Sequence, residues 1–277
     1  MRFSAALLAL LGVAACSGSQ THTARPAGEP VAEGGPHAWG YMGSGAPESW
    51  ASLSPEYSVC ASGRFQSPID LGPIAAADVD ALEVAYQADL LRIMNNGHTI
   101  QVNHQANSTL KVGGHPFRLL QFHFHSPSEH TELGRQHELE LHLVHQDQVG
   151  NYAVVAVFID EGAESGHTDA LWRYLPEDAD EMNHTYEGKL VDPKAFLPPS
   201  LRHYQYHGSL TTPPCTETVV WNVLASPLMM SAEHIARFRE LYSANARPVQ
   251  PRASWCLAPH LIGPVEADSS DQGSTPP

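Results

Sequence analysis

The apolar positions along this chain repeat mainly with the two-residue period of β-strands. Residues 99–103 (TIQVN) alternate apolar and polar side chains, which is typical of a half-buried strand. Other runs are apolar almost throughout and predict buried strands. These runs lie at residues 119–125, 139–144, 152–159 and 218–224.

Helical periodicity is convincing at only two places. Ser231 is suited to cap a helix, and apolar residues follow it at helical spacing, namely Ile235, Phe238 and Leu241. Residues 168–175 predict a shorter helix that ends before Pro176. Strands with scattered helices predict a mainly β fold, in which loops and a few short helices surround a large, mostly antiparallel sheet.

Composition and charge narrow the class of protein. The chain has 277 residues, of which 42% are hydrophobic and 16% charged, enough for one large globular domain or two small ones. Its formal net charge is −15, and its only lysines are Lys111, Lys189 and Lys194. This balance argues against a nucleic-acid partner, because such proteins bind phosphates with clustered lysine and arginine. The simpler interpretation of the acidity is solubility.

The N-terminus has the features of an export signal. Arg2 precedes an apolar run that is too short to span a membrane comfortably. The run ends in VAAC, residues 13–16, which resembles the lipobox of bacterial lipoproteins, where the cysteine is lipidated and becomes the new N-terminus. Ordinary cleavage after Ala15 is the alternative. Both interpretations make residues 1–15 a signal peptide and predict a periplasmic protein or a lipoprotein anchored at Cys16.

Polar segments flank the central region. Residues 16–35 are rich in Gly, Pro, Ser and Thr, which predicts a flexible tether. Residues 263–277 contain few apolar side chains and predict a disordered acidic tail. One folded domain is therefore expected between them, at residues 36–262.

Histidines occupy one face of two predicted strands. Side chains two apart on a strand project from the same face, so His123 and His125 point together, away from the phenylalanine that precedes each of them. A neighbouring strand supplies a third imidazole, His142, which lies between two leucines. Three neutral imidazoles with an open fourth position are the pattern of a catalytic zinc site.

Two other interpretations of these histidines remain open. A single buried strand histidine is usually satisfied by hydrogen bonds, but a same-face pair with a third on an adjacent strand weakens that account. Metal-storage sites usually lie in histidine-rich loops and not in core strands. The sequence therefore favours a catalytic metal centre formed by His123, His125 and His142.

Several segments together resemble the α-class carbonic anhydrases, in particular their bacterial branch. The segments around the histidines are QFHFH, SEHT and ELHLVH, and others follow the family's order from about Trp39 to Pro251: AWGY, QSPID, NNGH, GSLTTPPC and RPVQP. Each segment alone is weak, whereas the set is very specific. The resemblance implies a ten-stranded, mostly antiparallel twisted sheet with Zn²⁺ at the bottom of a conical cavity.

The resemblance implies a zinc lyase that hydrates carbon dioxide reversibly to bicarbonate and a proton, by attack of zinc-bound hydroxide. Gln121 and Glu140 would accept hydrogen bonds from the rings of His123 and His142, as partners of metal ligands commonly do. On pattern alone, Glu140 could instead be a surface charge at a strand edge, although its position on the same face as His142 favours the buried role.

The resemblance also implies a gate, that is, a threonine hydroxyl that selects which groups can bind beside the metal ion. Thr211 resembles the family's gatekeeping threonine, Glu129 resembles the carboxylate that accepts its proton, and Thr212 would line the site beside them. Without the flanking motif, Thr211 would be interpreted as an ordinary turn hydroxyl.

The resemblance further assigns residues to the substrate and to proton transfer. The apolar pocket for carbon dioxide would consist of Val144, Val154, Leu210, Val219 and Trp221, although plain core packing explains such residues equally well. His98 lies where the family often has a proton shuttle, a role that suits the pKa of histidine. The connecting water molecules would be ordered by Tyr41, Asn96 and Gln101. If His98 and Gln101 both line the cavity, the strand between them must start irregularly.

The cysteines beyond Cys16 are Cys60, Cys215 and Cys256, an odd number that indicates one disulfide and one leftover thiol. The resemblance pairs Cys60 with Cys215, as in exported members of the family. Cys256 has no implied role and is either a buried free thiol or an intermolecular link. Bacterial relatives are often dimers, so a homodimer is also expected.

Two rival functions remain. A non-catalytic binding protein on the same fold typically lacks one or more metal histidines, whereas all three are present here. A zinc hydrolase acting on esters is a second enzyme class, and the sequence does not exclude esters as a side reaction. The HExxH motif of common zinc proteases is absent from the sequence.

Overall fold

The computed structural model describes residues 39–72, 82–163, 167–179 and 184–252, which all belong to one folded unit, Gly34–Pro277. The predicted signal peptide, tether and acidic tail lie outside the described residues, as do Cys16 and Cys256. None of the helices in the described ranges is both long and apolar enough to cross a membrane.

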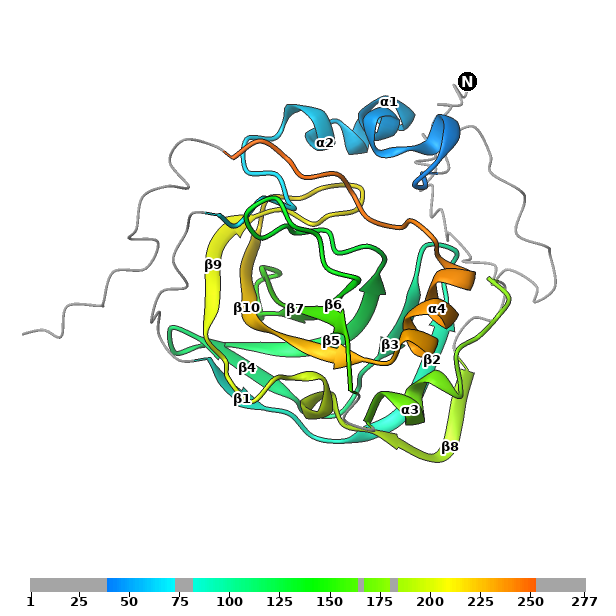
Figure 1. Cartoon of the computed structure of the whole chain (residues 1–277). Coiled ribbons are helices and arrows are strands. Elements are labelled where there is room, and N and C mark those ends of the chain that lie inside the picture. Colours follow the sequence, from blue (N-terminus) through cyan, green and yellow to red (C-terminus); the bar gives the residue numbers. More distant parts are fainter. Residues whose placement is uncertain (1–38, 73–81, 164–166, 180–183, 253–277) are drawn as a thin grey trace, which may run out of the picture. The chain divides into compact units, whose positions relative to one another are not determined.

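A ten-stranded sheet forms the centre of the unit (Figure 1). Its strands are β1 (Glu83–Ala85), β2 (Asp89–Asn95), β3 (Ile100–Asn103), β4 (Thr109–Val112), β5 (His115–His125), β6 (Leu139–Gln146), β7 (Tyr152–Glu161), β8 (His184–Val191), β9 (His203–Gly208) and β10 (Val219–Met230). The order is β8-β2-β3-β5-β6-β7-β10-β9, and β4 joins β5 and β1. Among the pairs of named strands in the described residues, only β7 and β10 are parallel, so the predicted mostly antiparallel sheet is confirmed.

The central strands are buried on both faces. On β6, the leucines at 139, 141 and 143 pack into the larger of two main hydrophobic clusters, while Val144 packs into the other. Glu140 and His142 share the face of Val144 because strand side chains alternate. This double burial explains why β6 and β7 are nearly continuous apolar runs, and why a polar side chain there needs a partner.

A β-bulge in β5 changes which side chains face the histidine side. The register shifts between Leu119, which pairs with His145, and Gln121, which pairs with Val144, so Leu120 is the extra residue. Leu119 is fully buried in the larger cluster, whereas Leu120 and Gln121 are only partly buried. Two successive residues therefore line the same side, an arrangement that a regular strand cannot produce.

A tight hairpin joins β4 to β5 at Gly113 and Gly114. Val112 pairs directly with His115, so these two glycines form the whole turn. Both have positive φ, 56° and 79°, the left-handed conformation that a two-residue type I′ turn requires and that glycine adopts without steric cost.

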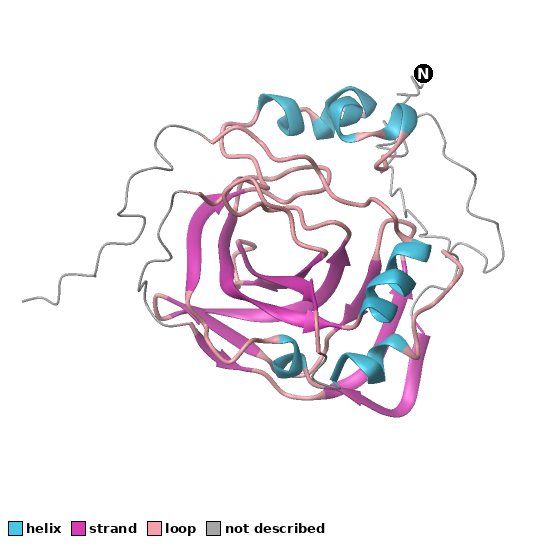
Figure 2. Ribbon diagram, in the orientation of Figure 1, coloured by secondary structure: helices cyan, strands magenta, loops and turns pink. Residues whose placement is uncertain are grey.

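Short helices lie outside the sheet (Figure 2). They are α1 (Trp50–Leu53), α2 (Val59–Ser62), α3 (His167–Trp172) and α4 (Ala232–Leu241), with 3₁₀ turns η1 (Gly43–Gly45), η2 (Pro47–Ser49), η3 (Pro55–Tyr57) and η4 (Pro193–Phe196). The predicted cap is confirmed, because the Ser231 hydroxyl accepts a hydrogen bond from the backbone N–H of His234 at 3.2 Å. Ile235 and Phe238 bury the apolar face of α4 against the larger cluster.

Two predicted boundaries differ from the structure. The helix expected at 168–175 ends at Trp172, and a turn follows in which the N–H of Tyr174 donates to the carbonyl of Leu171. The strand expected at 218–224 continues to Met230 after a register shift between Leu224 and Leu228. Pro227 lies in that irregular stretch, where no ladder hydrogen bond is required from it.

His145 gives the fold a pH-dependent stability. Its ring is fully buried on the leucine face of β6, where Nε2 lies 2.8 Å from the Tyr86 hydroxyl and Nδ1 lies 3.1 Å from the Ala153 carbonyl oxygen. Burial lowers its pKa to about 4. In the unfolded chain this histidine has an ordinary pKa near 6.5. Between pH 6.5 and pH 4, His145 is therefore protonated in the unfolded chain but still neutral in the folded chain, which favours unfolding as the pH falls.

We expect the free energy of unfolding to fall by up to about 3 kcal/mol across that pH window because of His145 alone. In His145→Gln, urea unfolding should give a lower free energy at pH 7, because a buried hydrogen bond is lost, but a shallower decline toward pH 5. The control is His115→Gln, whose side chain is 58% exposed. Equal slopes for the wild type and His145→Gln would contradict the assignment.

Candidate metal centre and active site

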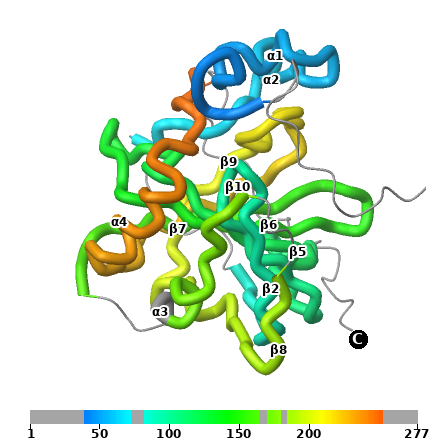
Figure 3. The backbone as a smooth tube through the Cα atoms, turned by 90° about the vertical axis from the view of Figure 1, so that its right-hand side faces the viewer, coloured from blue at the N-terminus to red at the C-terminus, as the bar shows by residue number. Residues whose placement is uncertain are grey.

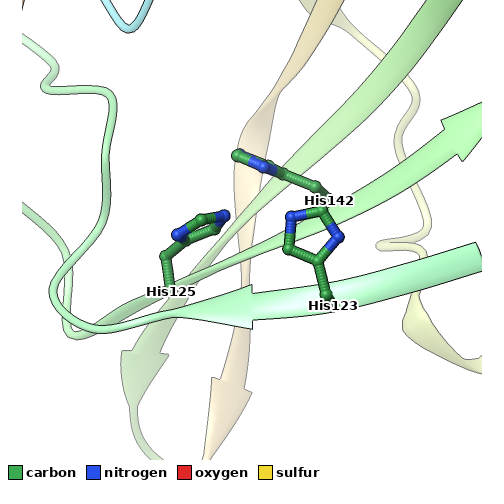
Figure 4. Close-up of side chains that lie close together, drawn as sticks. All are labelled: His123, His125 and His142. Carbon is green, nitrogen blue, oxygen red and sulfur yellow. The ribbon is translucent and has the colours of Figure 1, made fainter. Parts of the chain in front are cut away.

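Three histidine rings from two adjacent strands converge on one point (Figure 4). His123 and His125 extend from β5, and His142 extends from β6, where it pairs directly with His123. One ring nitrogen from each lies within 4.8 Å of the others. His125 and His142 are each 1% exposed and His123 is partly buried. The structure thus brings together the three side chains that were expected on one face of the sheet from the alternation of side chains along a strand.

Each ring is oriented by a hydrogen bond through its other nitrogen. His123 Nδ1 donates to Gln121 Oε1 at 2.8 Å, and His142 Nε2 donates to Glu140 Oε1 at 2.7 Å, the partners that the family resemblance implied. His125 Nδ1 donates to the backbone carbonyl of Asn245 at 2.8 Å. A backbone carbonyl carries no residue signature, so nothing in the sequence pointed to Asn245.

The nitrogens left over have the character of metal ligands. His125 Nε2 is buried without a hydrogen-bond partner, and a buried polar atom in that state costs about 1–3 kcal/mol. Burial and the neighbouring imidazoles hold the pKa of His123 well below its usual range. Burial also lowers the pKa of His125, although the Glu129 carboxylate acts in the opposite direction. The rings of His123 and His125 are therefore neutral at pH 7, the form that binds a metal ion.

Glu140 is the buried anchor of this cluster. Besides His142, it accepts hydrogen bonds from the backbone N–H and the Nδ1 of His130, at 2.8 and 2.7 Å. Burial alone would raise its pKa, but the contacts with His130 and His142 outweigh that effect and hold the pKa well below the usual range. A second group that could hold a metal ion consists of His130, Glu140 and His142. Because His130 and Glu140 are hydrogen-bonded to each other, the group of His123, His125 and His142 is the better metal site.

A cavity of about 260 Å³ opens beside His123 and His142. Its walls include nine of the residues that the sequence assigned to the site: Gln121, His123, His142, Val144, Val154, Leu210, Thr211, Thr212 and Trp221. Val219 does not line it and lies in the buried cluster behind, 1% exposed. Leu120 and Tyr152, which the sequence did not assign, do line it. The β-bulge in β5 explains why Leu120 faces the cavity.

Known proteins resemble this chain in sequence and in structure. The family model described as eukaryotic-type carbonic anhydrase matches residues 45–253. A carbonic anhydrase of Nostoc sp. is 43% identical over 218 residues, covering 77% of this chain and 82% of that protein, and one of Pectobacterium carotovorum is 42% identical over 214 residues, covering 77% and 87%. The α-carbonic anhydrase from Thermovibrio ammonificans, solved with the inhibitor sulfanilamide, superposes with a TM-score of 0.75 at 43% identity, covering 80% of this chain and 98% of that chain.

The chain belongs to the α-class carbonic anhydrases. It is therefore an enzyme of the family that hydrates carbon dioxide, and the expected ten-stranded fold is confirmed.

In this carbonic anhydrase, Glu129 lies close to two of the three histidines but not in the expected hydrogen bond. Its Oε1 accepts from the backbone N–H of Arg247 at 2.8 Å, while its Oε2 is buried without a partner. The Thr211 hydroxyl, in a residue 5% exposed overall, therefore makes no hydrogen bond to Oε2. The expected pair is close to the site, yet the bond between its members is not formed in this structure.

Arg247 connects Glu129 to the N-terminal helices. Its guanidinium donates to the carbonyls of Ser67 and Cys60 at 2.8 and 2.9 Å and lies over the ring of Trp50 at 5.5 Å. Burial lowers its pKa to about 10. The sequence contained Arg247 only as part of the RPVQP segment, so this role was not predicted.

The proposed shuttle of the carbonic anhydrase, His98, is half-buried and stacks on Trp39, with ring centroids 3.7 Å apart and planes 9° apart. Burial lowers its pKa. His98 lies in a bend that follows Gly97 (φ 82°), and β3 begins only at Ile100. The chain is thus irregular between His98 and Gln101, as it would have to be if both residues lined the cavity.

The three other polar residues assigned to the water network differ in their surroundings. Asn96 holds the bend through its side-chain oxygen, which accepts from the N–H groups of His98 and Thr99, and its amide nitrogen donates to Gln101 at 3.5 Å. Burial and the charge of Glu129 hold the pKa of Tyr41 well above its usual range. Tyr41 is therefore a neutral phenol near the carboxylate of Glu129.

The disulfide of this carbonic anhydrase is formed as predicted. Cys60 in α2 is bonded to Cys215, with Cα atoms 5.0 Å apart. The N–H of Cys215 donates to the Thr212 carbonyl at 2.9 Å, and Gln66 donates to the Cys215 carbonyl at 3.1 Å. The bridge thus fastens the loop that carries Thr211 and Thr212 to the N-terminal segment.

Proposed function

We propose that this carbonic anhydrase hydrates carbon dioxide with a Zn²⁺ ion bound by His123, His125 and His142. The observation that carries the proposal is the buried, unpartnered Nε2 of His125, grouped within 4.8 Å with one nitrogen of each other ring. Three neutral imidazoles suit zinc, and a site with three protein ligands keeps the fourth position for a water molecule. When bound, zinc lowers the pKa of such a water toward neutrality and supplies a nucleophile, a chemistry best known from carbonic anhydrases themselves.

The other residues of the site orient the three histidine rings and form the wall of the substrate cavity. Gln121, Glu140 and the carbonyl of Asn245 hold the three rings in one tautomer each. Val144, Val154, Leu210 and Trp221 form an apolar wall suited to a small apolar substrate. Val219 supports that wall from behind.

Thr211 and Glu129 form the gate in this proposal. Glu129 Oε2 is a buried acceptor without a donor, and the threonine hydroxyl is a donor of the right kind. Once the hydroxyl donates to Glu129, it offers only lone pairs to the site. It then accepts from a protonated group and rejects an unprotonated one, which orients the attacking water. Thr212 lines the cavity beside it.

His98 carries the proton to solvent. A half-buried imidazole with a lowered pKa releases a proton readily at neutral pH. Asn96 and Gln101 are hydrogen-bonded to each other, and with Tyr41 they can order water between His98 and the histidine cluster. These roles rest on the matching positions of the family.

The decisive experiment is stopped-flow hydration of carbon dioxide by the purified enzyme before and after removal of metal with a chelator. We expect activity to vanish with the metal and to return with one equivalent of Zn²⁺ but not with Mg²⁺, which prefers oxygen ligands. Metal content is measured in parallel by elemental analysis. Full activity in demonstrably metal-free protein would overturn the proposal.

Export and anchoring also belong to this proposal. We infer a mature chain that begins at Cys16, carries lipid there, and holds the catalytic domain, residues 36–262, through the tether 16–35. The Cys60–Cys215 disulfide fits an oxidising compartment. Mass spectrometry of the native N-terminus tests the lipid, and light scattering of the purified domain tests the expected homodimer.

A further inference from the structure

A second cavity, of about 380 Å³, lies on the opposite face of the sheet from the three histidines. It is bounded by α3, β8 and η4, and its floor belongs to the hydrophobic cluster that contains the leucines of β6. Figures 1 and 3 place α3 and β8 at the end of the unit away from α1 and α2. Nothing in the proposed reaction uses this cavity.

The floor of the cavity is apolar and buried. Leu91, Leu171, Val191 and Phe196 are 3%, 2%, 8% and 1% exposed. Small side chains, Ala170 and Ala195, complete the walls and leave the space open. A concave apolar surface of this volume is the usual shape of a small-molecule site.

The rim of the cavity carries a net positive charge. Arg173 and Lys189 line it, and neither has an ion-pair partner among the described residues. The ammonium of Lys189 lies 6.0 Å from the ring centroid of Tyr174, and Asp192 is the one acidic side chain among the described residues of the lining. These described residues therefore carry two positive charges and one negative charge, a net +1, in a chain of net charge −15 that has only 15 lysines and arginines.

We propose that this cavity binds a small monocarboxylate with an apolar chain or ring, about the size of octanoate. The apolar body fills the space above Leu91 and Phe196, and the carboxylate pairs with Arg173 and Lys189 at the rim. A neutral ligand would gain no ion pair with either cation, and a cation would be repelled. A single negative charge matches the net charge of the described lining residues.

Binding here is independent of catalysis. The β-sheet separates the cavity from the histidine cluster, so octanoate in this cavity leaves carbon dioxide hydration unchanged. A carboxylate that instead reached the histidine cluster would inhibit the enzyme. The rate of hydration therefore distinguishes the two locations.

The test is a titration of the zinc-loaded enzyme with sodium octanoate, followed by amide chemical shifts and by stopped-flow hydration. We expect saturable shifts at residues 170–174 and 189–192, with the hydration rate unaltered. 1-Octanol, which has the same chain without the charge, should bind at least about fivefold more weakly.

Matched variants identify the charges that act. Lys189→Gln and Arg173→Gln should each weaken octanoate binding roughly fivefold to tenfold, because each removes a charged partner at a partly solvated rim. Lys194→Gln removes the same charge from η4 at a residue that does not line the cavity, and should leave the affinity unchanged.

Three results would overturn the proposal. They are shifts confined to the residues around His123 and His142, equal affinities for octanoate and 1-octanol, and equal weakening in all three variants. Since each substituted side chain lies on the surface, the variants should fold, and their hydration rates verify that they do.

Discussion

Replacement of His142 by alanine should abolish carbon dioxide hydration and zinc binding together. The variant leaves two imidazoles on β5 and deprives Glu140 of one of its hydrogen-bond donors. Loss of a partner of a metal ligand already costs about 10–100-fold in metal affinity. Loss of the ligand itself should therefore lower activity by more than about a hundredfold. Zinc content by elemental analysis and stopped-flow hydration measure the two effects.

The matched control for His142→Ala is His115→Gln. His115 begins the same strand as His123 but is 58% exposed and paired with Asp147 at the surface. It should keep full zinc content and full activity. His123→Ala is a second test, because its partly buried site tolerates truncation better and separates ligand loss from misfolding. A His142→Ala enzyme that retained zinc and activity would refute the metal centre.

Loss of the Cys60–Cys215 disulfide should cause the largest loss of stability. The bridge joins residues 155 apart in sequence, and the chain-entropy account gives about 5 kcal/mol for closing such a loop. Native-state effects usually reduce the measured value, so we expect the double variant Cys60→Ala/Cys215→Ala to lose about 3–5 kcal/mol. The melting temperature should fall by roughly 10 °C. Urea unfolding and calorimetry at pH 7 provide the measurement.

Ala61→Ser is the control for that pair. It changes the exposed neighbour of Cys60 in α2 without touching the bridge, so its unfolding midpoint should match that of the wild type. Equal midpoints for the double variant and the wild type would show that the disulfide adds no stability. The double variant should also have a less constrained Thr211 loop, because Cys215, at the end of that loop, is no longer tied to α2.

The alternation of side chains between the two faces of a strand explains why the metal-binding histidines could be found from sequence. Residues two apart on a strand share a face, so His123 and His125 were predicted to point together, with His142 facing them from the next strand. The structure places His145, three residues beyond His142, on the other face, against Tyr86. Sequence reasoning worked here because the relevant geometry is local to each strand.

Elements with weak or mixed patterns were missed. The hairpin of β4 and β5 was not predicted, although the pair Gly113-Gly114 is a strong turn signal. Strand β8 is mostly exposed and edges the sheet, so its burial pattern is uninformative. Strand β10 was cut short because Ser226 and Pro227 disfavour a strand locally, whereas pairing with β7 resumes beyond them.

The sequence by itself determined the fold class, the three metal-binding candidates and, through family resemblance, the disulfide and the activity. These follow from local periodicity and from motifs that name side chains. Only the tertiary structure decided that Asn245 orients His125, that Arg247 rather than Thr211 donates to Glu129, and that Leu120 joins the cavity wall. Each of these features depends on a backbone group or on a register shift, and both arise when distant segments pack together. Neither can be read from the residue types in the sequence.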